Sequence, residues 1–216
     1  MVISSVVTFY PLNSIYRGAS HCEQLSTEVV ILRCPMQKLS VQELLFQYEA
    51  GKRDFSNTDL SQAYLFEANL SQANFANSNL SNIHIPYADL SETSFQNSNL
   101  NKAELSNSQL YQANFSNSNL SQANLSRANL RFADLSNTNL VGADLQAADL
   151  AYANLRGADL SYANLTNAKL DHANLTDTQL IGANLFRTQN AELAQAIVDA
   201  TTTLPDGHRP ADDAAN

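Results

Sequence analysis

A five-residue period runs through most of this 216-residue chain and limits the folds that are open to it. Every fifth residue from Phe55 to Leu185 is Leu, Phe or Ile, which makes 27 consecutive pentads. A small residue, most often Ala, stands two positions before each of these centres, and Asn or Asp is the commonest residue between the two. An amphipathic helix repeats near 3.6 residues and a strand near 2, so neither explains this period.

The pentad is typical of a short extended segment followed by a corner. In an extended segment the centre and the small residue two before it point the same way, while the Asn or Asp between them points to the opposite side. The two remaining residues are mostly Ser, Asn, Gln or Gly, which favour turns. We therefore expect each pentad to form one side of a coil, with its centre inside and its Asn or Asp outside.

Two columns of residues spaced by 20 indicate four pentads per turn. One face is expected to carry the core centres Phe55, Phe75, Phe95, Phe115, Leu135, Leu155 and Leu175, and Phe occurs at no other centre. Three residues after these centres stand the hydroxyls of Thr58, Ser78, Ser98, Ser118, Thr138 and Thr178, with only Ala158 departing. Because a buried hydroxyl needs a partner, we expect this column to bond backbone carbonyls or itself.

The outward Asn residues are expected to form ladders along the faces. One such column, also spaced by 20, consists of Asn79, Asn99, Asn119 and Asn139. Stacked amides of this kind pair with the amides of the layers above and below. The role predicted for them is structural.

The tandem A-(N/D)-L-x-x array over residues 53–187 resembles the pentapeptide repeat family of bacterial type. The resemblance implies an all-β solenoid, a right-handed quadrilateral β-helix of about seven coils, and it alone implies the handedness. A single coil buries too little to be stable, so stability is expected to arise cooperatively from stacking.

A short helix is predicted to cap the N-terminal end of the array, within residues 36–52. Ser40 and Glu43 form a capping box, and Gly51 follows as a C-terminal stop. The apolar residues between them share one helical face: Val41, Leu44, Leu45 and Tyr48. Such a helix would lay its apolar face over the first coil.

Residues 188–216 are predicted to contain a second capping helix and an acidic, disordered tail. The helix is expected over residues 191–200, because Leu193, Ala196 and Ile197 lie on one stripe. The tail that follows is small and acidic, a composition that favours disorder. With this helix covering the coil end we expect a monomer, and a dimer through a coil end, as occurs in the family, is the alternative.

Residues 1–35 show no clear period and are left unassigned. Our hypothesis is that Met36, four residues before the capping box, is the natural start and that residues 1–35 are an over-extended gene start. A real but disordered arm is the alternative. Native peptides upstream of Met36, seen by mass spectrometry, would contradict the hypothesis. No basic segment precedes the apolar residues near the beginning, so we expect a cytoplasmic protein rather than a secreted one.

Composition and residue spacing argue against several classes of function. The formal net charge of −9 excludes a basic nucleic-acid binder. The sequence contains no apolar run of about 18 residues, so it predicts no membrane span. Cys22 and Cys34 with His21 fall short of zinc-ligand spacing. His84 and His172 have no partners for a catalytic triad, and six glycines form no phosphate loop. We expect no enzyme activity, no cofactor and no metal.

One corner of the coils departs from the polar pattern and is the candidate partner-binding patch. Phe132, Tyr152 and His172 are spaced by 20, and Tyr111 and Arg131 occupy the adjoining corner column. Aromatic residues with Arg are the composition of interface hot spots. The alternative is that these rings merely cover the corner backbone. A second, smaller departure, Phe66 with Pro86 and Tyr87, lies near the first coils.

Three functions remain open on these observations. The first is a rigid scaffold that binds an unknown protein partner, with no direct contact to nucleic acid or membrane. The second follows from the resemblance, because some family members are acidic rods that mimic DNA and inhibit type II topoisomerases such as DNA gyrase. Residues 53–187 carry a net charge of only −5, spread over four faces, which fits this mechanism poorly. The third is a structural protein without a fixed partner.

Overall fold

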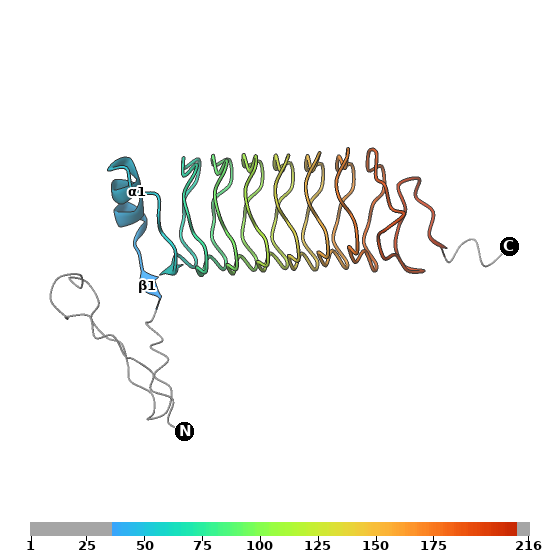
Figure 1. Cartoon of the computed structure of the whole chain (residues 1–216), viewed down its shortest axis with the longest axis horizontal. Coiled ribbons are helices and arrows are strands. Elements are labelled where there is room, and N and C mark those ends of the chain that lie inside the picture. The colour runs from blue at the N-terminus through green and yellow to red at the C-terminus, as the bar shows by residue number, and fades with distance from the viewer. Residues whose placement is uncertain (1–35, 211–216) are drawn as a thin grey trace, which may run out of the picture. The chain divides into compact units, whose positions relative to one another are not determined.

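The computed structural model describes residues 36–210. The predictions for residues 1–35 and for the end of the acidic tail lie outside the described residues. Within them, the elements are β1 (Gln37–Lys38), α1 (Val41–Glu49) and β2 (Thr58–Asp59). From residue 53 on the chain winds into a stack of coils, whose first coil contains β2, with α1 at the N-terminal end of the stack (Figure 1).

Successive coils pair in parallel through residues that are 20 positions apart. These bridges begin with Asp54 and Asn74 and continue to Lys169 and Gln189. At each bridge the outward residue donates its N–H to the coil before and accepts an N–H with its carbonyl. Asn74 N donates to Arg53 O at 2.7 Å, and its carbonyl accepts from Phe55 N at 2.7 Å. The predicted period of four pentads per coil is therefore the repeat of the backbone pairing itself.

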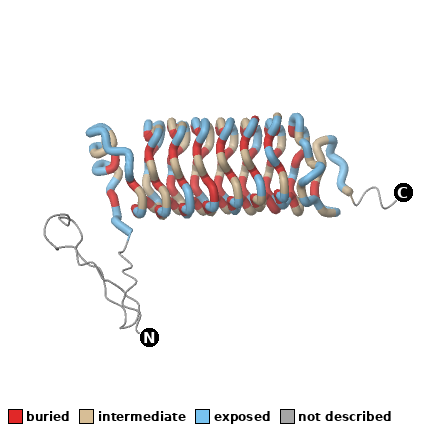
Figure 2. Tube along the Cα trace, viewed as in Figure 1, coloured by how far each residue is buried: buried red, intermediate tan, exposed pale blue. Residues whose placement is uncertain are grey.

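The core is a set of stacked columns inside the coils. The centres from Phe55 to Leu185 are buried, with the small residues beside them mostly buried too, and burial alternates regularly along each coil (Figure 2). The rings of Phe55, Phe75, Phe95 and Phe115 stack with successive centroid distances of 5.7, 5.7 and 4.9 Å. Leu135, Leu155 and Leu175 continue this face as buried residues.

The buried hydroxyl column bonds backbone carbonyls, as expected. Ser98 Oγ donates to Phe75 O at 2.7 Å, and Thr138 Oγ1 donates to Phe115 O at 2.8 Å. Each bond runs from one coil to a centre in the coil before it. Ser118 differs, because its buried Oγ has no hydrogen-bond partner within residues 36–210. The column thus adds bonds between layers, as the buried Thr93 and Ser108 hydroxyls do on other sides of the core.

The corners explain why Asn and Asp precede the centres. The outward side chain accepts the N–H of the first residue of its own corner, as Asp134 Oδ1 does from Ser136 N at 3.0 Å. It also bonds the neighbouring coil, since Asn154 Nδ2 donates to Asp134 Oδ1 at 3.0 Å. The predicted amide ladder is present from Asn79 through Asn99 to Asn119, with distances of 3.4 and 3.3 Å. Asn139 lies in the same column and accepts from Val141 N.

The second residue of every corner has a left-handed backbone, with φ of 58° at Asn57 in the first coil and 59° at Arg187 in the last. This conformation costs residues with a Cβ roughly 1 kcal/mol, and Asn and Gly tolerate it best. Gly182 illustrates a second reason for glycine, because a Cβ there would lie 2.7 Å from the Tyr162 ring. The frequent Asn and Gly at this position therefore follow from the geometry of the turn.

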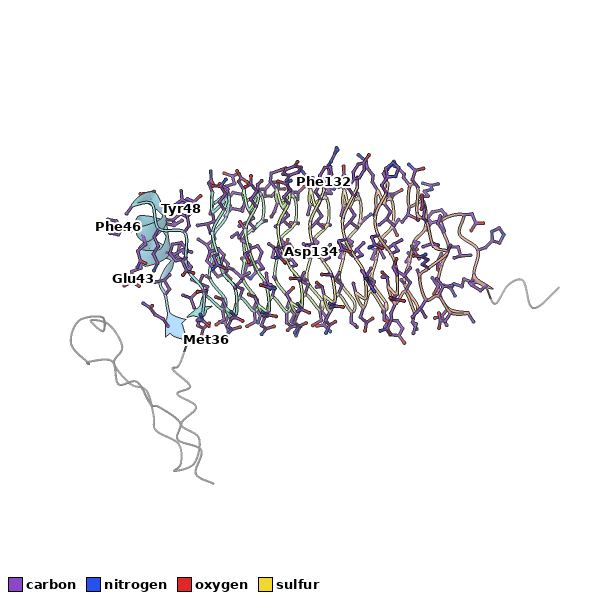
Figure 3. The ribbon with its side chains drawn as sticks, in the orientation of Figure 1. Met36, Glu43, Phe46, Tyr48, Phe132 and Asp134 are labelled. Atoms are coloured by element: carbon purple, nitrogen blue, oxygen red, sulfur yellow. The ribbon has the colours of Figure 1, made fainter. Side chains whose placement is uncertain are left out.

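The N-terminal end is closed by α1 and β1. Both hydrogen bonds of the capping box are present between Ser40 and Glu43, and Leu44 is fully buried under the first coil. Tyr48 points toward the coils (Figure 3), where its hydroxyl donates to Ser71 O at 2.9 Å. β1 pairs in parallel with β2. The helix predicted here from its capping box is thus observed over Val41–Glu49.

The helix predicted over residues 191–200 is wrong. This segment forms an irregular extension of the last coil, with bridges from Gln179 to Ile197 and from Asn184 to Thr203. The reason is that the preceding coil needs backbone partners, because Asp177 N donates to Gln195 O at 3.0 Å and Thr178 O accepts from Ile197 N at 2.8 Å. A helix over 191–200 would pair Gln195 O and Ile197 N internally and leave those two groups of the preceding coil unpaired. The expectation of a monomer rested on this helix and loses its basis.

Candidate functional site

The corner column singled out in the sequence forms a row of stacked rings. Phe132, Tyr152 and His172 each occupy the second position of a corner, one in each of three successive coils. The Phe132 and Tyr152 rings stack with centroids 4.9 Å apart and planes 6° apart. Tyr152 and His172 stack at 4.9 Å and 27°. Because the coils set the spacing between these backbones, the rings are held in register without contacts from a partner.

Tyr111 and Arg131 extend the row toward the N-terminal end. The Tyr111 ring meets Phe132 edge-on, with centroids 5.6 Å apart. The guanidinium carbon of Arg131 lies 5.9 Å from the centre of the Phe132 ring. All five side chains are exposed, and the labelled Phe132 points outward from its corner (Figure 3). We call these five residues the aromatic column.

The aromatic column carries backbone strain that Asn or Gly would relieve. Phe132, Tyr152 and His172 have φ of 59°, 62° and 55°, in the left-handed region that Asn and Gly tolerate best. The stacked rings cover most of one another's faces. Their edges stay exposed and form an apolar ridge that a partner can contact. The turn itself favours Asn or Gly at these positions. Aromatic residues there add strain without helping the turn, and strain of this kind points to function.

The polar groups beside the aromatic column are already engaged. Lys169 lies 3.6 Å from Asp149 on the adjoining face, and Asp171 accepts a hydrogen bond from the Asn190 amide. Arg131 N donates to Asn129 Oδ1 at 3.3 Å. The aromatic column is therefore a row of rings with Arg131 beside Phe132, bordered by side chains that bond within the coils.

The described residues offer no arrangement for acid–base or metal chemistry. Within residues 36–210, no group of three or more His, Cys, Asp or Glu side chains converges on a possible metal site. The Ser56 N–H and side chain bond the Asp54 carboxylate and hold its pKa below the ordinary value. Such carboxylates stay ionised as turn caps, whereas a general acid needs a raised pKa. In the same part of the chain no helix is long and apolar enough to cross a membrane.

A small cavity lies in the core of the first coils. It is apolar, has a volume of about 10 Å³ and is lined among others by Phe75, Ile83 and Phe95. Ligand pockets have volumes of roughly 300–1,000 Å³, so this cavity is too small for a ligand.

Sequence reasoning missed one pair of stacked rings. Tyr64 and His84 stack with centroids 4.5 Å apart and planes 1° apart. Beside them, Phe66 and Tyr87 are tilted by 57° at 5.7 Å. The signal was available, because Tyr64 and His84 are also 20 residues apart and stand where Asn or Asp is the rule.

Comparison with known protein families finds one match. The family model described as pentapeptide repeats matches eight copies, over residues 53–82, 88–127, 123–161 and 148–186. These segments together span more than half of the chain. A comparison with curated protein sequences finds no match.

Comparison with solved structures finds several similar coil stacks. A trypsin-treated variant of QnrB1, a plasmid-mediated fluoroquinolone resistance protein, is 19% identical with a TM-score of 0.61, and the match covers 68% of this chain and 75% of that one. HetL of the cyanobacterium Nostoc sp. strain PCC 7120, involved in heterocyst differentiation regulation, is 29% identical with a TM-score of 0.36 and coverage of 79% and 99%. A thylakoid lumen protein of Arabidopsis thaliana is 30% identical with a TM-score of 0.39 and coverage of 50% and 72%. The likeness to QnrB1 supports the fold alone.

Proposed function

This chain belongs to the pentapeptide repeat family, and from that premise we propose that it is a non-enzymatic scaffold that binds a protein partner through the aromatic column. The observation that carries the proposal is the continuous row of exposed rings from Tyr111 to His172, held in register on strained corners. The partner is a protein with an apolar surface that matches the ridge.

The physical argument rests on preorganisation. A partner that binds flexible side chains must order them, at a cost of about 0.5–1.5 kcal/mol for each one. Here ring stacking and the coil backbone have already fixed Phe132, Tyr152 and His172. Aromatic residues with a neighbouring Arg are also the residues that dominate measured binding energies at interfaces. Repeat folds usually confine function to such a patch on a regular frame.

The test compares three full-length proteins as bait in native lysate. The first is the parent, and the second is Phe132→Asn/Tyr152→Asn, which replaces both rings with a residue that left-handed corners accept well. The third is the matched control Tyr162→Asn. Tyr162 occupies the same corner position with φ of 60°, is 68% exposed and lies on a different corner of the coil.

We expect the parent and the Tyr162→Asn control to retain the same partner and the double variant to lose it. Thermal melts of the three proteins check that folding is intact, and we expect the double variant to melt no lower than the control. Retention of the partner by all three proteins would contradict the assignment of the column. If no protein is enriched by any bait, the rings are corner packing and the structural role without a fixed partner is favoured.

A DNA-mimic role toward a type II topoisomerase is the second candidate. Its support is the acidic balance of the chain, with a formal net charge of −9. A mimic of duplex DNA needs dense negative potential along one side. In residues 53–187 the outward Asp residues are instead dispersed, as at Asp59, Asp134 and Asp149. The test adds the parent or the Phe132→Asn/Tyr152→Asn variant to purified gyrase and measures DNA supercoiling. Equal inhibition by both proteins would favour this candidate over the first.

A further inference from the structure

A second group of exposed rings lies on the first coils, away from the aromatic column. It consists of Tyr64, Phe66, His84 and Tyr87, which we call the N-terminal aromatic surface. Tyr64 and His84 stack at 4.5 Å on one face, and Phe66 and Tyr87 meet at 5.7 Å on the corner that follows. Tyr64, Phe66 and Tyr87 are 71%, 63% and 55% exposed. Single exposed apolar side chains are normal, but several exposed rings gathered at one place mark an interaction site.

The rings of this surface replace residues that the coil would use. Elsewhere the outward Asn or Asp accepts the N–H of its corner, as Asn69 Oδ1 does from Ser71 N at 3.1 Å. The Tyr64 side chain has no acceptor beside the backbone for that bond, and the corner after His84 begins with Pro86, which has no N–H to donate. Tyr87 has a left-handed φ of 59°. Four departures from the local rule at one place point to selection for contact with another molecule.

The stretch of chain that carries this surface is acidic. No Lys or Arg occurs between Arg53 and Lys102, while this stretch contains Glu67, Asp89 and Glu92. Asp54 and Asp59 of the same stretch interact with Lys52 and Lys38. Glu67 directly follows Phe66, and Asp89 stands two residues after Tyr87. Glu104 pairs with His84 in the backbone ladder and so continues the column of Tyr64 and His84. Its carboxylate accepts hydrogen bonds from Ser106 N and Asn124 Nδ2 and keeps its negative charge and further lone pairs for a cation. Lys102, on the preceding corner, is the cation nearest in sequence to this column.

The chain itself shows the contact that such a surface would make. At the same end of the stack, the Arg53 guanidinium carbon lies 3.9 Å from the centre of the Tyr48 ring. Ring faces attract cations, and Arg adds planar stacking and bidentate pairing with carboxylates. Exposed rings bordered by carboxylates therefore attract a guanidinium group in two ways, by stacking on the ring faces and by pairing with the carboxylates. The aromatic column differs, because it includes the cation Arg131, and the neighbouring Asp149 is paired with Lys169.

We propose that the N-terminal aromatic surface binds an arginine-rich basic segment of a protein partner. Its guanidinium groups stack on the open faces of Tyr64, Phe66 and Tyr87, and they pair with Glu67 and Glu104. This surface is separate from the aromatic column in position and in charge, so the inference does not depend on the proposed function. It predicts a preference for Arg over Lys and an affinity that falls as salt screens the carboxylates.

The test measures binding of a labelled oligo-arginine peptide to the full-length chain by fluorescence anisotropy. Oligo-lysine and oligo-glutamate peptides of equal length serve as comparisons. The aromatic variant is Tyr64→Asn/Phe66→Ser/Tyr87→Asn, which restores the residues that the repeat uses at these positions. Asn at 64 regains an acceptor for the N–H of residue 66, so this variant is expected to melt no lower than the parent. Tyr162→Asn is the matched control, and Glu67→Gln/Glu104→Gln tests the charge.

We expect the aromatic variant to bind oligo-arginine about tenfold more weakly than the parent, with the Tyr162→Asn control unchanged. The Glu67→Gln/Glu104→Gln variant should also bind more weakly and lose part of the salt dependence. The proposal is overturned if the aromatic variant binds as tightly as the parent, since charge alone would then explain binding. It is equally overturned if the parent does not prefer oligo-arginine to oligo-glutamate. The variant Phe132→Asn/Tyr152→Asn should bind like the parent, which separates this surface from the aromatic column.

Discussion

The two ends of the coil stack are closed by different structures. At the N-terminal end, α1 covers the first coil and inserts the fully buried Leu44. At the C-terminal end, residues 191–205 continue the coil irregularly, with pairing offsets that shorten from 20 residues to 18 at Ile197 and 19 at Thr203. Both solutions protect the edge of a stack that would otherwise pair with another chain. They differ in what stabilises them.

The N-terminal closure depends on apolar burial by an element with its own hydrogen bonds. The helix satisfies its backbone internally and through the Ser40–Glu43 capping box. The C-terminal closure depends on hydrogen bonds to the coil before it. Thr202, fully buried, donates its hydroxyl to Leu180 O at 2.8 Å, and Ile197 N donates to Thr178 O at 2.8 Å. The comparison predicts that the first end is sensitive to volume and the second to hydrogen bonding.

The largest effect is expected at Leu44. Leu44→Ala removes the side chain that fills the space between α1 and the first coil, so the free energy of unfolding should fall by about 2–5 kcal/mol. Thermal or denaturant unfolding of the full-length protein measures this change. Phe46→Ala is the matched control on the same helix, because Phe46 is 72% exposed and points away from the coils (Figure 3). A loss for Phe46→Ala as large as that for Leu44→Ala would contradict the burial argument.

A smaller effect is expected at Thr202. Thr202→Val keeps the shape and removes the hydroxyl, which donates to Leu180 O and accepts from Asp199 N at 3.1 Å, at a cost of about 1–2 kcal/mol. Thr178→Val removes only a bond to the coil before it, to Leu155 O at 2.8 Å. Hydrogen exchange of the Leu180 and Leu185 amides reports opening of the C-terminal coil. A loss for Thr202→Val at least as large as that for Thr178→Val would show that this coil is as well ordered as the rest, and a loss confined to Thr178→Val would show that it frays.

The smallest effect concerns pH. The Thr201 side chain, with further donors from Gly182, Thr201 and Thr202, lowers the pKa of Asp199 from the ordinary 3.8 to about 2. Because the folded pKa is the lower one, this contribution to stability is present above pH 3.8 and is lost as the pH falls toward 2. The protection factor of the Gly182 amide in hydrogen exchange should fall over that range, because this amide donates to Asp199 Oδ1 at 3.2 Å. In Asp199→Asn this fall should be absent, and its persistence would contradict the assignment.

The sequence predicted which surface residues lie next to each other, but it did not predict how exposed they are. The spacing of 20 was enough to place Phe132, Tyr152 and His172 in one column, because residues one coil apart always lie next to each other. The same rule applied to Tyr64 and His84 places those rings together, although that pair was missed in the sequence. In both cases adjacency follows from the period. Exposure, ring tilt and the neighbouring charges needed the packed coils.

The sequence alone determined the coil and its four sides, because each pentad contains its own corner, its inward pair and its outward cap. It also determined α1, since the capping box at Ser40 and Glu43 is a local signal. Only the tertiary structure decided the C-terminal closure. The apolar stripe of residues 191–200 is compatible with a helix, but Asp177 N and Thr178 O need backbone partners, which Gln195 O and Ile197 N supply. Those needs belong to the preceding coil, and no pattern within the segment itself records them.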